Sequence, residues 1–304
     1  MTRPRIPKLK KIYMPVGYCH RRIVAEWLEA ALGIEIPEMA VKKMKVAYGR
    51  DAEGWSLLAF NGWRGCAHGC RYCYGPRTSH ISPEEFRIPQ PRAGDILEDL
   101  DRDLQLLSQH DGPLSIKLGN RWEDILGPFP HVLLMLNCDP YSPPGGDLSL
   151  TRTILAKFNQ YAVPFKVLTK AGGKAVADFD LYGRDDWFGI SLTFLNEADT
   201  KYWEPGASSV HDRLSALQEA HDRGIKTWIS VEAVIDQKQA INLIEAIQFV
   251  DFIYVGKIDQ NNEAEGKKTM SWPEFRLAAE EKLQELGKKP GIDYQIKRKL
   301  RDAI

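Results

Sequence analysis

The sequence has no apolar run approaching the ~20 residues that a membrane-spanning helix requires. Residues 1–11 are basic, but no apolar stretch follows them, so they do not resemble a secretory signal. We therefore expect a cytoplasmic protein with no membrane partner. Hydrophobic residues make up 43% and charged residues 27% of the chain, which is typical of an ordinary globular protein.

Cysteine is scarce, with five residues in a chain of 304. The number is odd, and Cys66, Cys70 and Cys73 fall within eight residues of one another. This clustering argues against a disulfide framework and favours a metal site in a reducing compartment.

The chain also lacks a net charge, with 41 basic and 41 acidic side chains, but the two signs are unevenly distributed. Residues 1–50 hold eleven Lys/Arg against four Glu, and residues 287–304 hold six against two Asp. Residues 51–286 hold 24 basic and 35 acidic side chains. The basic ends fit either nucleic-acid contacts or two solvated lysine-rich segments, and charge alone does not separate these readings.

Apolar periodicity predicts strands alternating with helices, which indicates βαβ units and a mostly parallel sheet of about seven strands after residue 55. The expected strands cover residues 41–48, 57–60, 114–118, 132–136, 165–169, 188–193, 225–231, 252–255 and 294–296. The expected helices cover residues 20–32, 96–107, 150–161, 211–223, 241–249 and 272–286. This pattern fits an open doubly wound sheet or a barrel, complete or partial.

The three clustered cysteines have the spacing C-x3-C-x2-C, within residues 61–74 (NGWRGCAHGCRYCY). Three thiolates in one loop can each bind one iron of a cubane cluster, and no fourth cysteine follows in register. Gly62, Gly65 and Gly69 would let the backbone curl around the inorganic core.

Two alternatives remain at this point. A tetrahedral zinc site would need a fourth ligand, for which His68 is the nearest candidate. Structural zinc usually pairs C-x2-C with a second such pair, which the sequence does not have. The other alternative is three buried cysteines with no metal.

The cysteine spacing, with aromatic Tyr72 before the last cysteine and a strand before the first, resembles the signature of the radical S-adenosylmethionine (SAM) superfamily. The resemblance implies a partial (β/α)6 barrel and a [4Fe–4S] cluster on Cys66, Cys70 and Cys73. It also implies that SAM binds the open iron and is reductively cleaved to a 5′-deoxyadenosyl radical. A reductase, or a flavodoxin or ferredoxin, would supply the electron.

Several further segments resemble the spore photoproduct lyase family and its DNA repair photolyase-like relatives. In chain order these are residues 65–74 (GCAHGCRYCY), 137–141 (NCDPY), 168–170 (LTK), 189–193 (GISLT) and 204–209 (EPGASS), the last running into Arg213 and Leu214. The resemblance spans roughly residues 61–255. The Glu-Pro-Gly segment is the most telling, because it is not a general radical SAM feature.

This resemblance assigns roles residue by residue. Lys170 and Ser191 match positions that contact SAM, and Tyr72 also lies where an aromatic residue packs near the adenine. Tyr72 and Tyr74 match tyrosines implicated in radical relay. Cys138 falls in the stretch where the lyase keeps a cysteine as hydrogen-atom donor. Each residue also has an alternative without a catalytic role. Lys170 and Ser191 would be ordinary polar groups at strand ends, Tyr72 and Tyr74 would pack beside the cluster, and Cys138 would be a small buried side chain.

We expect an N-terminal basic extension over residues 1–55, a radical SAM partial barrel over residues 56–260 and a C-terminal segment with a basic tail over residues 261–304. The favoured function is a radical SAM lyase or isomerase acting on a thymine-derived nucleobase in DNA, by lesion repair or by rearrangement of a modified base. The alternatives are a radical SAM enzyme acting on a peptide, a free nucleotide or a small metabolite, and a non-catalytic metal-binding protein.

Overall fold

The structure, a computed structural model, describes residues 46–48, 56, 58–108, 114–118, 121–125, 131–258, 269–288 and 291–302. The predicted helix over residues 20–32, Cys19 and most of the predicted extension over residues 1–55 lie outside the described residues.

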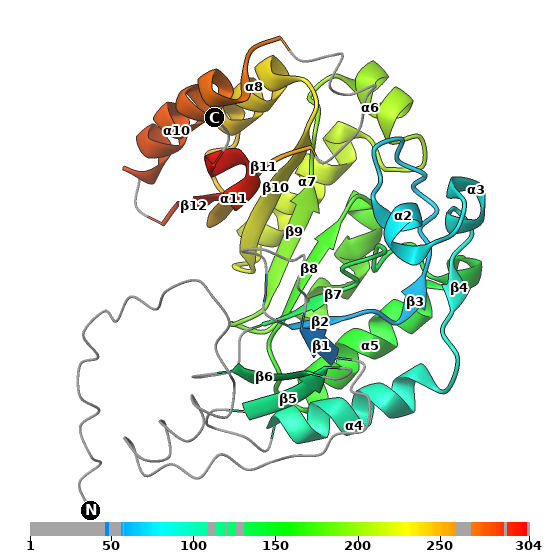
Figure 1. The fold of residues 1–304 in the computed structure, drawn as a ribbon. Helices are drawn as coiled ribbons and strands as arrows, with labels where there is room; N and C mark the ends of the chain where they lie inside the picture. Colours follow the sequence, from blue (N-terminus) through cyan, green and yellow to red (C-terminus); the bar gives the residue numbers. More distant parts are fainter. Residues whose placement is uncertain are drawn as a thin grey trace, which may run out of the picture.

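The fold is organised around an eight-stranded sheet in the order β1-β2-β7-β8-β9-β10-β11-β12 (Figure 1). Its strands are β1 (Val46–Tyr48), β2 (Leu58–Phe60), β7 (Val132–Leu134), β8 (Phe165–Thr169), β9 (Trp187–Ser191), β10 (Lys226–Val234), β11 (Phe252–Lys257) and β12 (Asp293–Ile296). The seven strands from β2 to β12 are parallel, and β1 pairs antiparallel with β2. This confirms the predicted α/β fold with a mostly parallel sheet and a last strand near residue 294.

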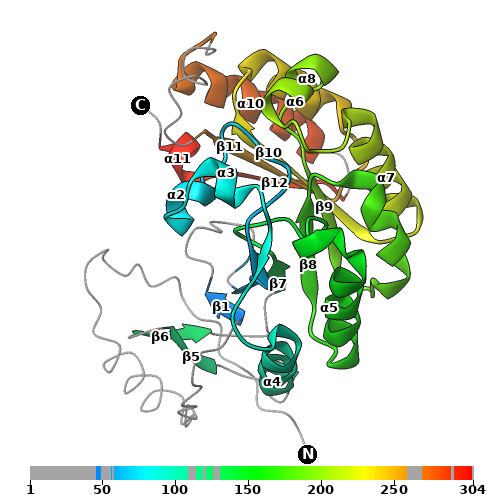
Figure 2. The ribbon, with the colours of Figure 1, turned by 90° about the vertical axis from the view of Figure 1, so that its right-hand side faces the viewer.

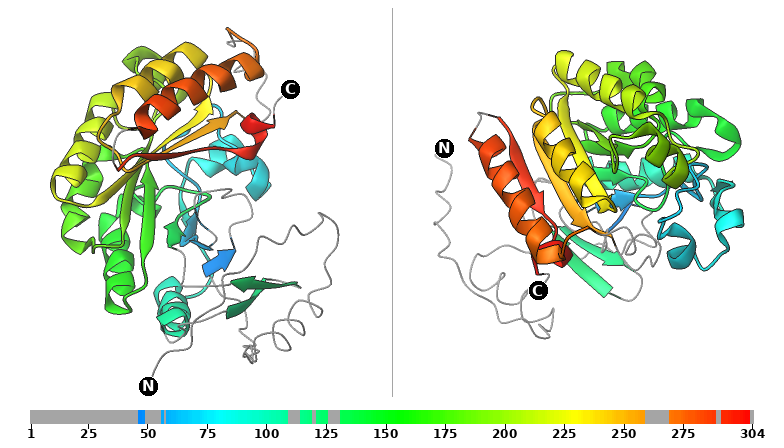
Figure 3. Two further views of the ribbon diagram at one scale, coloured as in Figure 1. Left: turned by 90° about the vertical axis from the view of Figure 1, so that its left-hand side faces the viewer. Right: turned by 90° about the horizontal axis from the view of Figure 1, so that it is seen from above.

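Helices cover one face of this sheet (Figures 2 and 3). They are α4 (Ile96–Ser108), α5 (Leu148–Gln160), α7 (Val210–Asp222), α8 (Gln237–Ala246) and α10 (Trp272–Gly287). Each lies close in chain order to a parallel strand, as βαβ connections require. No helix in the described part of the chain is long and apolar enough to cross a membrane.

Side-chain caps set the starts of these helices. Asp147 caps α5 by accepting from the amide of Ser149, Ser209 caps α7, and Asp236 caps α8. Ser271 and Glu274 form a reciprocal capping box at the start of α10. These caps satisfy amide groups that have no partner inside the helix.

The sheet buries both faces. Alternate residues such as Phe165, Val167 and Ile190 join the main core under the helices. The opposite, inner face carries a second apolar cluster of Ala59, Leu133, Trp228 and Tyr254, with partly buried neighbours. A Cβ atom at Gly189 would lie 2.4 Å from Nε1 of Trp228, so this glycine lets the indole lie across the sheet.

The long connection between β2 and β7 carries the cysteine cluster, and two short helices of this connection lie across the sheet from α5 and α7 (Figure 2). It contains β3 (Trp63–Arg64), α2 (Gly75–Ser79), α3 (Pro83–Phe86), β4 (Gln90–Pro91), α4, β5 (Leu114–Leu118) and β6 (Arg121–Ile125). The remaining elements are η1 (Pro144–Gly146), η2 (Gly172–Leu181), α6 (Glu197–Trp203) and α11 (Arg298–Arg301).

Most predicted elements of the described chain are present, with shifted ends. The strands over residues 114–118 and 165–169 have the predicted bounds. The helix predicted over residues 241–249 instead covers Gln237–Ala246, because Asp236 starts it earlier and apolar residues continue past its end. The elements α2, α3, α6, η1, η2, α11, β3, β4 and β6 were not predicted, and most of them are too short to show a period.

Candidate active site

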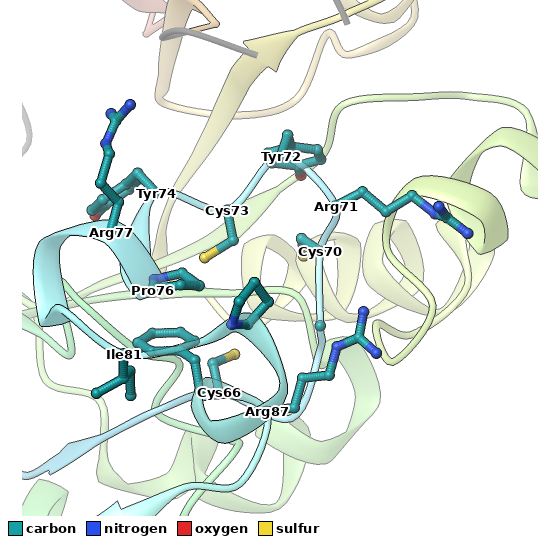
Figure 4. A pocket seen from close by; sticks show the side chains of 13 residues that line it. Cys66, Cys70, Arg71, Tyr72, Cys73, Tyr74, Pro76, Arg77, Ile81 and Arg87 are labelled. Atoms are coloured by element: carbon teal, nitrogen blue, oxygen red, sulfur yellow. The ribbon is translucent and has the colours of Figure 1, made fainter. Parts of the chain in front are cut away.

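The cysteine loop, residues 65–74, lines an open cavity of about 610 Å³ together with helices α2 and α3 (Figure 4). Cys66, Cys70 and Cys73 all line it, so the structure brings the three predicted ligands to one site. The thiols of Cys66 and Cys73 point into the cavity from different sides. Its other lining residues are Gly69, Arg71, Tyr72, Tyr74, Pro76, Arg77, Ile81, Pro83, Phe86 and Arg87.

Helix α3 and the chain after it hold the loop in shape. The amide of Cys66 donates to the carbonyl of Phe86 at 2.7 Å, and the amide of Cys73 donates to that of Cys70 at 3.1 Å. Gly65 has φ +95°, and a Cβ atom there would lie 2.8 Å from the carbonyl oxygen of Phe86. Glycine is therefore required at this position for the chain to curl as the sequence predicts.

The donor set of the cavity consists of the three thiols of the cysteine loop. Among the described residues, no three His, Cys, Asp or Glu side chains are grouped so that they could hold one metal ion. Tetrahedral zinc at about 2.3 Å from each sulfur would require such convergence. In a cubane each thiolate binds a different iron, so thiols spread around a cavity fit that group. Burial raises the pKa of the Cys66 and Cys70 thiols, so both stay protonated when no metal is bound.

His68 does not face the cavity as the fourth ligand that a zinc site would need. Its Nδ1 atom lies 2.9 Å from the carbonyl oxygen of Gly206, and its Nε2 atom lies 3.0 Å from Oδ2 of Asp139. Both side chains are buried. Both ring nitrogens are therefore engaged away from the three thiols, and the zinc alternative through His68 loses its fourth ligand.

Asp139 ties the cysteine loop to the ends of two strands. Its carboxylate accepts from the amides of Tyr141 and Lys170 and from the hydroxyl of Thr169, each at 2.8 Å. Burial alone would raise the pKa of Asp139, but His68 and the backbone donors lower it below its usual value. The carboxylate therefore stays ionised inside the protein.

A second buried carboxylate, Glu204, gathers the residues predicted to contact SAM. Its Oε1 atom lies 3.1 Å from Nζ of Lys170, and its Oε2 atom lies 2.7 Å from a terminal nitrogen of Arg213. The Lys170 ammonium also donates to the hydroxyl of Ser191, and the Tyr72 hydroxyl donates to Glu204. The structure thus brings Tyr72, Lys170 and Ser191 together at the C-terminal edge of the sheet.

Charge pairing keeps Glu204 ionised. Burial alone would raise its pKa, but Lys170, Arg213 and Tyr72 lower it to about 2. Arg213 is fully buried, and it also donates to the carbonyls of Ser191 at 2.8 Å and Ser208 at 3.0 Å. The segment from Glu204 to Arg213 is therefore one charge-paired unit.

A close backbone contact requires glycine at position 206, in the Glu-Pro-Gly segment. A Cβ atom at Gly206 would lie 2.4 Å from the carbonyl oxygen of Ala67, so only glycine allows this turn to touch the cysteine loop. The amide of Gly206 donates to the carbonyl of His68 at 2.8 Å, and the amide of Arg71 donates to that of Trp203 at 2.8 Å. Residues some 130 positions apart in the chain thus form one wall of the site.

The two tyrosines of the loop occupy different surroundings. The Tyr72 hydroxyl lies 3.2 Å from that of Thr193, and the Tyr72 ring lies 5.6 Å from Nζ of Lys170. Tyr74 donates to the carbonyl of Leu136 at 2.9 Å and keeps 36% of its surface exposed. Tyr72 is therefore part of the polar network, whereas Tyr74 lies at its rim.

Cys138 lies just beyond β7, on the C-terminal side of the sheet. Its Sγ atom is 3.5 Å from the carbonyl oxygen of Trp63, the residue that begins β3. It is not among the residues that line the cavity of the three cysteines. Burial raises the pKa of this thiol, so it is held as neutral S–H.

Sequence patterns alone gave no role to His68 as an ion-pair partner, nor to Asp139, Glu204 or Arg213. Each lies inside a segment that carried the family resemblance. A buried charged residue inside a motif is a usable signal, because such residues are almost always paired.

Known structures share this fold. Spore photoproduct lyase complexed with dinucleoside spore photoproduct has 13% identity and a TM-score of 0.58, with 84% of this chain and 80% of that chain covered. A mutant of that lyase with bound AdoMet and dinucleoside spore photoproduct has 13% identity and a TM-score of 0.57, with 84% and 79% covered.

A third likeness is to Streptococcus suis SuiB bound to S-adenosylmethionine, with 12% identity, a TM-score of 0.55 and 79% of this chain covered. This chain spans about half of SuiB, 49% of its length. No protein-family model and no curated sequence matches the chain. The likenesses confirm the resemblance to radical SAM enzymes at the level of the fold.

Proposed function

We propose that this chain is a radical SAM enzyme whose Cys66, Cys70 and Cys73 hold a [4Fe–4S] cluster. The carrying observation is that three thiols of one loop line a cavity directly beside the buried network of Tyr72, Glu204 and Lys170. When bound, the reduced cluster and SAM supply a 5′-deoxyadenosyl radical that abstracts hydrogen from a substrate. The barrel of residues 56–260, with β12 from the C-terminal segment, would provide the walls and exclude water.

Lys170 and Ser191 would hold SAM. An ammonium at a strand end can pair with the SAM carboxylate, and a serine hydroxyl can bond to its carboxylate or ribose oxygens. In the structure these two groups contact each other, and Glu204 neutralises the lysine. Tyr72 would pack near the adenine, beside the same lysine.

Lys170→Ala and Ser191→Ala are each expected to weaken SAM binding by about 1–3 kcal/mol, the cost of a lost charge-assisted bond. The iron content should not change, because neither residue lines the thiol cavity. Lys174→Ala is a matched control, since Lys174 is an exposed lysine four residues further on. Equal SAM affinity in all three variants, measured by equilibrium dialysis, would refute the assignment.

Cys138 would donate a hydrogen atom to the substrate radical. Its S–H bond would break and a substrate C–H bond would form. The thiyl left on Cys138 would return to S–H with an electron and a proton relayed through Tyr72 or Tyr74, the electron coming from the reductase, flavodoxin or ferredoxin. The residue lies beyond β7 at the C-terminal side, where parallel α/β folds place their sites. For donation, the thiol must turn from the Trp63 carbonyl toward the substrate.

Cys138→Ala and Cys138→Ser are both expected to cleave SAM but to yield altered products, such as adducts of the unquenched radical. Serine can keep the bond to the Trp63 carbonyl, so a shared effect points to the S–H group and not to packing. Products are identified by mass spectrometry. Wild-type product at the wild-type rate from Cys138→Ala would leave Cys138 a packing residue.

We further propose that the substrate is a thymine-derived nucleobase in DNA, acted on by a lyase or isomerase reaction. Residues 64–92 hold five arginines and two glutamates, although residues 51–286 as a whole are acidic. All five arginines are exposed, and three of them line the thiol cavity, namely Arg71, Arg77 and Arg87. Arginines around a site favour a substrate whose phosphates stay outside while a base enters.

The test is anaerobic incubation with SAM, dithionite and either UV-irradiated or base-hypermodified DNA, read by mass spectrometry. A changed thymine derivative supports the proposal, together with DNA binding that weakens steeply as salt increases. SAM cleavage without any change in DNA would instead favour a peptide, nucleotide or metabolite substrate. A peptide is a concrete alternative, because SuiB has also been solved bound to precursor peptide SuiA.

The electron would come from a reductase, a flavodoxin or a ferredoxin. Cys73 is exposed, so the cluster would lie near the protein surface and within reach of such a partner. A cytoplasmic location fits this proposal, because the site requires three cysteines in the thiol state.

A further inference from the structure

The C-terminal edge of the sheet carries a second pair of largely buried charges, separate from the Glu204 network. Nζ of Lys297 lies 2.6 Å from Oε2 of Glu232, and their side chains are 9% and 23% exposed. Glu232 lies near the end of β10, and Lys297 directly follows β12. Because buried charges are costly to desolvate, stability alone does not account for an ion pair at this place.

Strand register places both side chains on the inner face of the sheet. Tyr254 belongs to the inner apolar cluster, and side chains alternate along a strand, so Gly256 faces the same way. The amide of Lys297 donates to the carbonyl of Val255 at 2.9 Å, which puts Lys297 beside this glycine. A Cβ atom at Gly256 would lie 2.6 Å from Oε1 of Glu232. The carboxylate therefore crosses β11 over Gly256 to reach Lys297.

The pair lies next to the residues proposed to hold SAM. The hydroxyl of Ser191 donates to the backbone carbonyl of Glu232 at 3.3 Å, so β9 and β10 are joined at this point. The side chain of Glu232 extends the other way, toward β11 and β12. Lys170 and Ser191 lie at the ends of β8 and β9, so the pair occupies the neighbouring part of the same edge.

A carboxylate beside an ammonium offers a hydrogen-bond acceptor next to a set of donors. The imide edge of thymine presents the complement, an N3–H donor flanked by the O2 and O4 acceptors. Cytosine presents an unprotonated N3 at the same place, and a carboxylate repels it. Changes at the C5 methyl group leave the imide edge intact. The pair therefore matches the edge that thymine and its C5-modified derivatives have in common.

Cations that suit a nucleic-acid backbone lie beside the pair. Helix α11 directly follows Lys297, and its Lys299 and Arg301 are exposed. Phosphate contacts position a nucleic acid, whereas contacts to base edges specify the base. The basic C-terminal segment therefore fits a strand whose phosphates stay outside while one base lies against Glu232 and Lys297.

We propose that Glu232 and Lys297 are specificity-determining residues that bind the imide edge of the substrate base. The carboxylate of Glu232 accepts from N3–H, and the ammonium of Lys297 donates to a ring carbonyl. This inference rests on the proposed function, because it assumes a thymine-derived substrate. The two residues hold the base and take no part in the radical chemistry.

The first test uses the wild-type protein, reconstituted with iron and sulfide and saturated with SAM. Fluorescence anisotropy measures its binding to three single-stranded oligonucleotides that differ at one position, which is thymidine, N3-methylthymidine or deoxycytidine. We expect the thymidine oligonucleotide to bind about tenfold more tightly than the other two, because a paired contact to a base edge discriminates to this degree. Equal binding of all three, or no binding of any, would overturn the proposal.

The second test replaces both charges at once, so that neither is left unpaired in the interior. Glu232→Leu with Lys297→Met should lose the preference for thymidine and keep the SAM affinity of the wild type. The matched control is Glu245→Leu with Lys282→Met, which removes an ion pair of 2.8 Å between α8 and α10 and should keep the preference.

A retained thymidine preference in the variant that lacks Glu232 and Lys297 would overturn the proposal. Lost SAM affinity with an unchanged preference would do the same, because the pair would then belong to the SAM site. If the wild type binds no iron, the proposed function fails, while the anisotropy series still tests the pair. If the wild type cleaves SAM and the double variant still prefers thymidine, only this inference fails.

Discussion

Replacement of any one of Cys66, Cys70 and Cys73 by alanine is expected to abolish SAM cleavage. It should also lower the bound iron from about four atoms per chain to a small fraction of that number. The reason is that all three cysteines line one cavity, and no other cysteine of the described residues lines it. With only two thiolates left, two of the four irons have no protein ligand, so the cubane is no longer stably bound. Iron and sulfide are assayed after anaerobic reconstitution, together with 5′-deoxyadenosine formation.

Cys138→Ala is the matched control for this series. Cys138 is a partly buried free cysteine of the same region, but it does not line the cavity. It should retain the full iron content and still cleave SAM. Full iron and full activity in any one of the three loop variants would show that the wrong cysteines are assigned.

Arg213→Met is expected to destabilise the protein by about 3–5 kcal/mol, as removal of one partner of a buried ion pair does. Arg213 and Glu204 are both fully buried, 2.7 Å apart, and the arginine also donates to two backbone carbonyls. Methionine fills much of the volume but leaves the carboxylate with Lys170 as its remaining cation. The measurement is urea unfolding of the metal-free protein.

Arg223→Met is the control for that experiment. Arg223 pairs with Glu219 one helical turn away at the surface, where such pairs contribute about 0.3–0.5 kcal/mol. A loss of less than 1 kcal/mol in Arg213→Met would mean that the buried network is not a stabilising unit.

Acid should bring the free energies of unfolding of Arg213→Met and Arg223→Met closer together. In the wild type, the pKa of Glu204 is lowered to about 2, below its unfolded value near 4.3. The stability that ionised Glu204 contributes is therefore complete above about pH 5 and is lost as the pH falls toward 2. In Arg213→Met the pKa of Glu204 is lowered less, so a smaller part of the free energy of unfolding is lost between pH 5 and pH 2.

The sequence predicted the parallel sheet because buried strands such as residues 165–169 read as short apolar runs between amphipathic helices. Helix α6 escaped prediction, because its seven residues mix charged and aromatic side chains and its start depends on the Asn196 cap. One strand of the β5–β6 hairpin was predicted. Residues 114–118 alternate apolar and polar side chains, as a strand does, whereas the partner strand over Arg121–Ile125 carries three charged residues.

The candidate site, too, was predictable from the sequence only in part. The three cysteines were predictable, because their spacing in one loop is local. The contacts of Glu204 with Lys170 and of His68 with Asp139 join residues 34 and 71 positions apart. Such pairs arise only when strand ends meet at one edge of the sheet, and no local pattern specifies them.

The most direct test of the central claim is anaerobic reconstitution with iron and sulfide, followed by reduction and electron paramagnetic resonance with and without SAM. The account predicts about four irons per chain, a broad visible absorbance and a reduced-cluster signal that SAM changes. It also predicts that all three features vanish when Cys66, Cys70 and Cys73 are replaced together. One zinc per chain, or a cluster that forms equally well without these cysteines, would contradict it.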